Sequence, residues 1–135
     1  MAKSFKFKTK IYYEDTDAGG IVYYANYLKY FERARTELVY SLGFNHKALK
    51  DEHGVFIIVK SCNIHFNKPV KFEDEVEIET IIKKISPVRL VLNQIAKVKD
   101  QEHVVADVEL AVIEESGKPK KMPNTLFDKF KSCIW

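Results

Sequence analysis

Two carboxylates stand two positions apart near the start of the chain, and two glycines follow the second one almost at once. The residues are Asp15 and Asp17, with Gly19 and Gly20 behind them. A carboxylate in a polar loop can act as a general base, as a nucleophile or as a ligand for a cation. Glycine permits backbone conformations with positive φ and the close approach of another molecule to the main chain. This loop is therefore the first candidate for a site that does chemistry.

An amphipathic helix is predicted directly after this loop. From Tyr23 onward, apolar residues recur at three- and four-residue steps, which is the spacing of one buried helix face. Gly43 is a suitable C-terminal cap, so the helix should end there. Asp17 then lies just before a helix N-terminus, where free backbone N–H groups and the helix dipole favour negative charge. The predicted buried face consists of Tyr24, Tyr27, Leu28, Phe31, Ala34 and Leu38.

The rest of the chain predicts a sheet that covers this helix. Most of its segments alternate polar and apolar residues, as half-buried strands do, and the segment 55–66 has a continuous apolar start that indicates a buried strand. One apolar sheet face and one amphipathic helix bury each other, so we expect an α+β fold with a curved antiparallel sheet wrapped around one long central helix. Strands are predicted at 5–13, 55–66, 75–85, 88–98 and 104–114, and short helices at 45–52 and 124–131.

Composition narrows the class of protein. The 135 residues are expected to form one domain, 1–135, which is large enough to bury a core. A net charge of +3 does not indicate a nucleic-acid partner. Cys62 and Cys133 form no CxxC motif, which predicts reduced thiols in a cytoplasmic protein. No segment approaches the ~18 apolar residues of a membrane span, and the N-terminus has no apolar signal core.

Metal and phosphate chemistry fit the loop poorly. A calcium loop that starts at Asp15 would place Gly19 at its fifth position and Asn26 where the bidentate glutamate belongs. The DxDxxG string of phosphatases of the haloacid-dehalogenase type needs Thr or Val where Gly19 stands. The four histidines have no carboxylate or cysteine company at ligand spacing. We therefore expect no metal site and no bound cofactor.

The segment from Tyr12 to Glu37, YYEDTDAGGIVYYANYLKYFERARTE, resembles one family, the hotdog-fold acyl-CoA thioesterases of the 4-hydroxybenzoyl-CoA thioesterase and YbgC type. The likeness covers residues 11–42 and, more weakly, residues 61–80. It implies hydrolysis of an acyl-CoA to a carboxylic acid and free coenzyme A, without a metal or redox cofactor. It also implies a homo-oligomer, either a dimer or a dimer of dimers, with active sites between protomers.

Roles for two residues follow from the same resemblance. It implies that Asp17 is catalytic, either as a nucleophile or as a general base for water, and that the backbone amide of Tyr24 polarises the thioester carbonyl. The chemistry is reasonable because a thiol leaving group has a pKa near about 8.5 and needs little acid assistance. Backbone N–H groups at a helix start are preorganised donors for the developing oxyanion. Asp15 is instead predicted to bond local backbone in the turn.

Contacts to the coenzyme A phosphates are expected from basic residues. Lys84 and Arg89, on either side of the Ser86–Pro87 turn, are the first choices, and Gly19 and Gly20 are expected to lie close to the substrate. The remaining basic candidates are Lys60, Lys68, Lys83 and the cluster Lys118–Lys121.

Two other functions compete with thioester hydrolysis. A hotdog dehydratase acting on hydroxyacyl thioesters would generally need a His with Glu or Asp, and no His lies near the loop. A noncatalytic module that binds acyl-CoA or an acyl-carrier protein would have no need for the base, yet Asp17 is present. Release of free thiol from acyl-CoAs separates these three functions.

Overall fold

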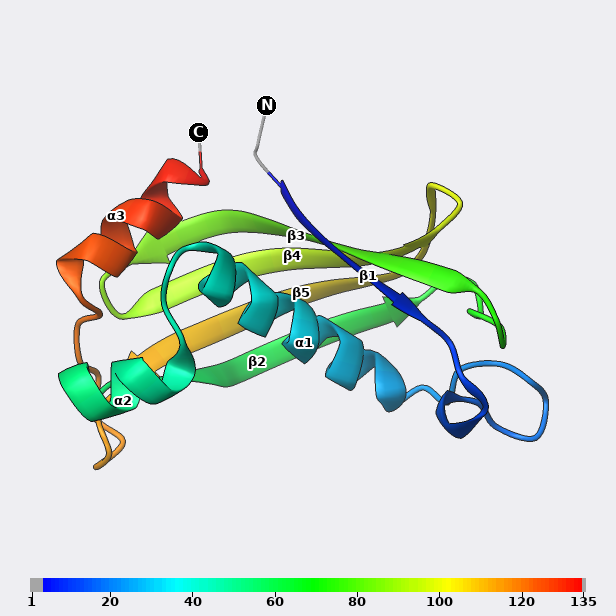
Figure 1. Ribbon diagram of the computed structural model, residues 1–135, viewed down its shortest axis with the longest axis horizontal. Helices are drawn as coiled ribbons and strands as arrows, with labels where there is room; N and C mark the ends of the chain where they lie inside the picture. Colours follow the sequence, from blue (N-terminus) through cyan, green and yellow to red (C-terminus); the bar gives the residue numbers. More distant parts are fainter. Residues whose placement is uncertain (1–3, 135) are drawn as a thin grey trace.

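A five-stranded antiparallel sheet curves around one long helix (Figure 1). The computed structural model describes residues 4–134. The strands stand in the order β1-β3-β4-β5-β2, so β1 and β2 form the two edges. The predicted architecture is therefore confirmed. The strands are β1 (Ser4–Lys10), β2 (Phe56–Phe66), β3 (Glu75–Ser86), β4 (Arg89–Val98) and β5 (Gln101–Ile113), and the helices are α1 (Asn26–Ser41), α2 (His46–His53) and α3 (Asn124–Ser132).

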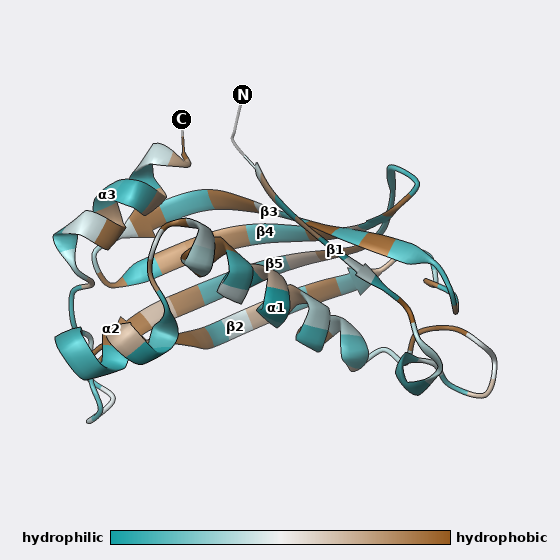
Figure 2. Cartoon of the chain, in the orientation of Figure 1, coloured by the Kyte–Doolittle hydropathy of each residue, from teal (hydrophilic) through white to brown (hydrophobic). Residues whose placement is uncertain are grey.

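Strands β3, β4 and β5 supply the sheet face that packs on the core. Their residues alternate between buried and partly exposed side chains, as expected for a sheet with one face on a core. In Figure 2 hydrophobic bands cross the strands under α1, while α1 carries hydrophilic residues on its outward side. Burial of these two faces against each other supplies the main stabilisation of the fold. Tyr27, Tyr30, Phe31, Ala34 and Leu38 are the α1 residues of this core.

One buried polar side chain fixes α1 on the sheet. Gln94 of β4 is fully buried and donates two hydrogen bonds from Nε2, each 3.0 Å long, to the main-chain oxygen of Phe31 and to Oγ1 of Thr80. Its Oε1 accepts a third bond of 3.0 Å from Nη1 of Arg35. The amide group thus satisfies its polar atoms inside the core and sets the position of the helix over β4.

The start of α1 and part of its buried face differ from prediction. The helix begins at Asn26, because the preceding residues form a turn closed by a 2.9 Å bond from the Asn26 N–H to the Tyr23 oxygen. Tyr24 therefore stands outside the helix and is 63% exposed, and Leu28 on the helix flank is 50% exposed. Tyr30, which was not predicted to face the core, is buried.

The predicted ends of the first two helices are confirmed. Gly43 follows α1 with a φ of 85°, the left-handed conformation that glycine adopts at little cost. The side chain of Asn45 caps α2 by accepting a 2.7 Å bond from the N–H of Ala48, and Gly54 closes its C-terminus. Among the described residues, we find no helix that combines the length and apolar character required to cross a membrane.

Strand β2 is much less buried than its sequence predicts. Its start was expected to be largely buried, yet Ile58 is 43% and Val59 is 48% exposed. The reason is topological: β2 pairs only with β5, and its other edge meets no strand within residues 4–134. A continuous apolar run on an edge strand leaves hydrophobic surface and backbone hydrogen-bonding groups uncovered.

Candidate active site

The predicted chemical loop is a small antiparallel turn of backbone that we call the carboxylate loop, residues 14–23. The N–H of Asp17 donates to the oxygen of Ile21 over 2.9 Å, and the N–H of Tyr23 donates to the oxygen of Asp15 over 3.0 Å. The first strand was predicted to run to position 13 but ends at Lys10, because the chain then turns into a short 3-10 helix at 13–15 and enters the loop. The two arms of the loop hold each other in place.

A segment distant in sequence, residues 70–72, pairs with the second arm of the loop. The N–H of Val22 donates to the oxygen of Val70 over 2.8 Å, and the N–H of Phe72 donates to the oxygen of Gly20 over 3.0 Å. Lys71 forms an isolated β-bridge with Ile21 and so places a basic residue next to the loop. Lys71 was not among the predicted coenzyme contacts, although residues 70–72 belong to the weaker part of the family likeness.

Asp17 lies on the surface of the loop with one carboxylate oxygen committed. Its Oδ1 accepts a 2.8 Å bond from the N–H of Gly19, and its main-chain oxygen accepts a 3.1 Å bond from Gly20. No hydrogen bond reaches Oδ2 from any of residues 4–134. A Cβ at Gly19 would lie 3.2 Å from Oδ1, and Gly20 has a φ of 78°. The two glycines therefore shape the turn that presents the free oxygen of Asp17 to solvent.

Asp15 has the local structural role that was predicted for it. Its Oδ2 accepts a 2.9 Å bond from the N–H of Tyr12, and its main-chain oxygen accepts a 2.8 Å bond from Nδ2 of Asn26. Tyr30 lies beneath it, and burial followed by the negative charge of Asp15 raises the pKa of this phenol well above its ordinary value. Asp15 thus ties the loop to the first residue of α1, while the sequence neighbour Asp17 points to solvent.

The turn between the loop and α1 leaves two backbone donors unused. Within residues 4–134 neither the N–H of Tyr24 nor that of Ala25 meets a hydrogen-bond acceptor. They stand at the positive end of the α1 dipole, where an oxyanion is favoured. The first turn of α1 is itself secured by the bond from Asn26 to Tyr23. The oxyanion role predicted for the Tyr24 amide stays a prediction, and Tyr24 lies in the turn before α1 and not in the helix itself.

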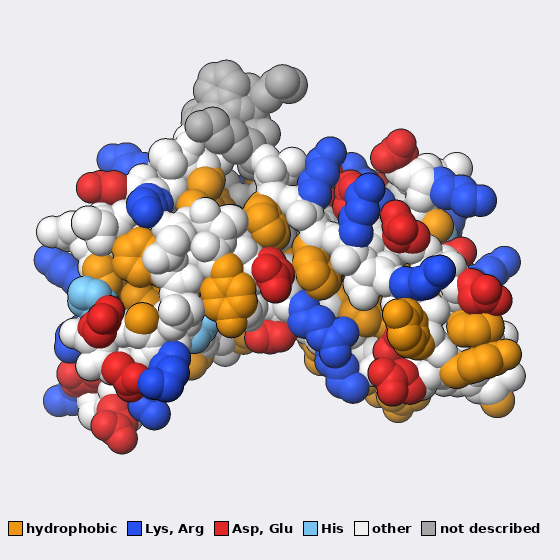
Figure 3. Space-filling view, viewed as in Figure 1, with side chains coloured by type: hydrophobic (Ala, Val, Ile, Leu, Met, Phe, Trp, Pro, Cys, Tyr) orange, Lys and Arg blue, Asp and Glu red, His pale blue; other side chains and the backbone are white. Residues whose placement is uncertain are grey.

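Aromatic rings border these free donors. The rings of Tyr24 and Phe66 meet edge to face with centroids 6.3 Å apart, and Tyr27 lies 5.6 Å from the same Phe66. Tyr13, just before the loop, stacks on Phe72 with ring centroids 3.9 Å apart. Figure 3 shows hydrophobic side chains gathered at this end of the molecule, at the lower right. The Asp17 carboxylate does not line any of the main cavities among the described residues. The arrangement is an open surface with apolar walls.

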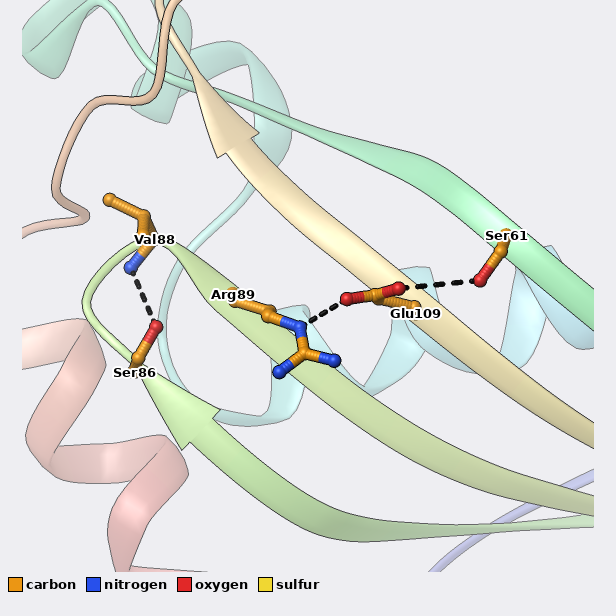
Figure 4. Close-up of polar contacts among 5 residues, drawn as sticks. All are labelled: Ser61, Ser86, Val88, Arg89 and Glu109. Atoms are coloured by element: carbon orange, nitrogen blue, oxygen red, sulfur yellow. Dashed lines mark hydrogen bonds and ion pairs between the residues drawn. The ribbon is translucent and has the colours of Figure 1, made fainter.

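Lys84 and Arg89 lie far from this loop. Both flank the β3–β4 turn at the opposite end of the sheet, and Arg89 forms an ion pair with Glu109 of β5 (Figure 4). Ser61 donates a further 3.4 Å bond to the same carboxylate. The Arg89 guanidinium holds the pKa of Glu109 below its ordinary value. Within one chain the structure does not bring these two predicted coenzyme contacts together with Asp17.

The antiparallel sheet wrapped around one long helix is a hotdog fold, and the relatives of this chain make its class a thioester hydrolase. A family model described as the thioesterase-like superfamily matches residues 12–130. Among curated proteins, the acyl-CoA thioester hydrolase YbgC of Escherichia coli O6:H1 is 33% identical over 131 residues, which cover 94% of this chain and 96% of YbgC. The Haemophilus influenzae acyl-CoA thioesterase YbgC is 39% identical over 94 residues, 70% of this chain and 69% of that protein. The chain belongs to the thioesterase-like superfamily and is of its YbgC type.

Solved structures agree with this membership. A Bartonella henselae protein described as a probable thioesterase is 34% identical, covers 89% of this chain and 99% of its own, and superimposes with a TM-score of 0.84. The 1,4-dihydroxy-2-naphthoyl-CoA thioesterase of Synechocystis superimposes with a TM-score of 0.87 at 18% identity, covering 95% and 96% of the two chains. The second likeness concerns the fold alone. Together they confirm the predicted hotdog fold.

Proposed function

We propose that this protein hydrolyses acyl-CoA thioesters, with Asp17 as the catalytic carboxylate and the amides of Tyr24 and Ala25 as the oxyanion donors. The observation that carries the proposal is that one oxygen of the exposed Asp17 carboxylate, and the N–H groups of Tyr24 and Ala25 in the turn that follows the loop, have no hydrogen-bond partner among residues 4–134. The names of the YbgC relatives support acyl-CoA as the substrate.

The overall reaction needs few groups. Water adds its oxygen to the thioester carbonyl carbon, the carbonyl oxygen becomes an oxyanion on the Tyr24 and Ala25 amides, and the C–S bond then breaks. The sulfur leaves as a thiolate and takes up a proton, while the acyl group leaves as a carboxylic acid. Preorganised amide donors stabilise the charge that develops at the oxygen, and one such donor is typically worth about 3 to 4 kcal/mol.

Asp17 can contribute by either of two routes. As a general base it accepts a proton from the attacking water. As a nucleophile its free oxygen attacks the carbonyl carbon, expels the thiolate and forms a mixed anhydride that water then hydrolyses. A single turnover in ¹⁸O-labelled water distinguishes them, because label found in the Asp17 carboxylate requires the anhydride.

We further propose that the active enzyme is a cytoplasmic homo-oligomer, a dimer or a homotetramer. The uncovered edge of β2, with Ile58, Val59 and Phe66 exposed, supports self-association, since a bare apolar edge is a liability in a monomer. A second copy across this edge would also turn the open surface beside Phe66 into a closed cleft. Free thiols at Cys62 and Cys133 fit the proposed cytoplasmic location.

We also propose which residues contact coenzyme A. Gly19 and Gly20 lie in the loop and would approach the substrate closely. Lys84 and Arg89 would reach the same coenzyme A only from another copy of the chain. Lys71, bridged to the loop through Ile21, is a nearer cation within the chain.

Thiol release from a panel of acyl-CoAs tests the proposed function. We expect Asp17→Asn to lower kcat by about 10²- to 10⁴-fold, the usual range for loss of an acid–base group. Asparagine keeps the oxygen that accepts the Gly19 N–H, so the loop should fold unchanged. The matched control is Glu14→Gln, an exposed carboxylate of the same loop, which should retain wild-type rates. Full activity of Asp17→Asn, or dehydration of hydroxyacyl-CoAs in place of thiol release, would refute the proposal.

A further inference from the structure

A cavity of about 210 Å³ lies between α1 and the sheet and shares no residue with the carboxylate loop. It is larger than the roughly 150 Å³ apolar cavity that suffices to bind benzene in an engineered protein. Its walls come from α1, α2, α3 and strands β2, β4 and β5. Most of the lining is aliphatic, and the apolar members include Ile57, Val59, Leu90, Leu92 and Leu110.

One cation stands in this wall without a counter-ion. Arg35 is partly buried, and burial lowers the pKa of its guanidinium below the ordinary value, against the opposing effect of the Glu32 charge. Its one hydrogen bond among residues 4–134 goes from Nη1 to the neutral Oε1 of Gln94. No carboxylate oxygen of these residues lies within 4.0 Å of the guanidinium, since the ion pairs found there involve other side chains. A buried charge without a partner is costly, and an anion supplied from outside would offset that cost.

Glu32 is the acidic side chain whose charge acts on Arg35, but the two form no ion pair within 4.0 Å. Glu32 lies one turn earlier on the same helix and also lines the cavity, but its Oε1 accepts a 2.9 Å bond from the hydroxyl of Thr36. Glu32 is exposed to solvent, so water screens its charge. The remaining N–H groups of Arg35 are therefore available to a ligand. A guanidinium offers paired donors that match the two oxygens of a carboxylate.

We propose that this cavity binds an aliphatic carboxylate, with the hydrocarbon chain among the aliphatic side chains and the carboxylate on Arg35. An amphipathic anion satisfies both parts of the cavity, whereas a neutral hydrocarbon would leave Arg35 uncompensated. The ligand is either a free short-chain fatty acid or the terminal carboxylate of a dicarboxylic acyl group. Binding of the free acid is independent of the proposed function. A role of the cavity in substrate selection rests on the proposed function.

Calorimetric titration with hexanoate tests the binding directly. We expect wild-type protein to bind hexanoate about 10- to 100-fold more tightly than hexanol, because hydrogen bonds to a charged group account for a difference of that order. Hexylamine should not bind. Arg35→Met should lose this preference, and Arg35→Lys, which keeps the positive charge, should retain part of it. Equal binding of hexanol and hexanoate, or unchanged hexanoate binding by Arg35→Met, would overturn the proposal.

Arg35→Met also removes the donor for Gln94, so a variant that leaves this bond intact is needed. Val59→Phe serves, since Val59 lines the cavity from the exposed edge strand and can accept a larger side chain without disturbing the core. Because Val59 also lies on the proposed self-association edge, light scattering checks that the variant keeps the oligomeric state of the wild type. The added ring should fill the cavity and weaken hexanoate binding at least tenfold with little loss of stability. Ile58→Phe is the matched control, because this neighbour points to the other face of β2 and should bind hexanoate as wild type does. Undiminished binding by Val59→Phe would place the ligand elsewhere and overturn the site.

Kinetics separate the two sources of the carboxylate. If the ligand is an acyl terminus, Arg35→Met should lower kcat/KM for adipyl-CoA at least tenfold and leave hexanoyl-CoA within twofold. If the ligand is a free acid, the two substrates should respond alike while hexanoate titration still depends on Arg35. Failure of the proposed function would appear as absent thiol release with all substrates, and it leaves the hexanoate titration of Asp17→Asn protein as an intact test of the cavity.

Discussion

The two ends of the sheet treat their polar groups in opposite ways. At the β3–β4 turn, Arg89 is paired with Glu109 and the turn is closed by short-range bonds. At the carboxylate loop, one oxygen of Asp17 and the amides of Tyr24 and Ala25 remain unpaired. Both ends are surface turns of the same sheet, so exposure alone does not explain the difference (Figure 1).

The hydrophobic surface follows the same division. The end that carries α2 and α3 buries Leu49, Leu126 and Phe130, whereas the loop end leaves Tyr24 and Phe66 about half exposed or more. Exposed aromatic rings that gather beside polar groups free to bond a ligand are typical of surfaces that bind another molecule. The loop end therefore leaves polar groups and aromatic rings uncovered, whereas the opposite end pairs its turn residues and packs α2 and α3 onto the core.

The strongest way to break this comparison is to remove one free donor. Tyr24→Pro eliminates the amide N–H at a position just before α1, where proline is tolerated. We expect kcat to fall by about 10²- to 10³-fold, the cost of losing one oxyanion donor. Tyr24→Phe keeps the amide and should remain within a few-fold of wild type. Circular dichroism checks that both variants fold. Wild-type turnover by Tyr24→Pro would exclude this amide as a donor.

A core substitution at the opposite end should have the reverse signature. Leu126→Ala truncates a fully buried side chain of α3 and is expected to lower the free energy of unfolding by about 3 kcal/mol. Denaturant titration measures this loss, and kcat of the folded protein should not change. Leu28→Ala, on the half-exposed flank of α1, is the matched control and should cost at most about 0.5 kcal/mol. Comparable losses in the two variants would contradict the assignment of the stabilising core.

The buried amide of Gln94 holds α1 on the sheet. Gln94→Met leaves the oxygen of Phe31 and the guanidinium of Arg35 without their partner, and we expect a loss of about 2 kcal/mol in the free energy of unfolding. The neighbouring Asn93→Ala, on the outer face of β4, removes an exposed bond to Asp107 and should cost well under half of that. Thermal unfolding compares the two. A loss no larger for Gln94→Met than for Asn93→Ala would show that the buried network does not position α1.

The smallest effect is expected at the paired turn. Arg89→Gln should destabilise the protein slightly at pH 7, since exposed ion pairs contribute little. The folded-state pKa of Glu109 is lowered by Arg89, so the contribution of the pair is present above the ordinary carboxyl pKa and is lost as the pH falls through the lowered value. Denaturant titration of both proteins at falling pH should show the difference shrink below about pH 4. A difference that grows in acid would contradict this ion pair as its source.

Much of the molecule could be predicted from the order of its residues. Alternation located β3, β4 and β5, three- and four-residue spacing located α1, and Gly43 marked its end, because these signals act over a few neighbouring positions. The family likeness of the carboxylate loop named Asp17 and the amide near Tyr24. The start of α1 was predicted too early, because the bond from Asn26 to Tyr23 that closes the turn competes with helix.

Only the tertiary structure decided what the predicted elements face. The apolar run at 56–59 predicts a buried strand, but the sheet order leaves β2 on an edge. No sequence pattern singled out Arg35, which the fold places against Gln94 and the cavity. Lys71 joins the carboxylate loop through a bridge to Ile21 that spans fifty positions of the chain. Local residue patterns determine which segments are strands and helices, because propensity and periodicity are properties of neighbours. Pairing and burial depend on contacts between segments far apart in the chain, and these fix which charges remain without a partner.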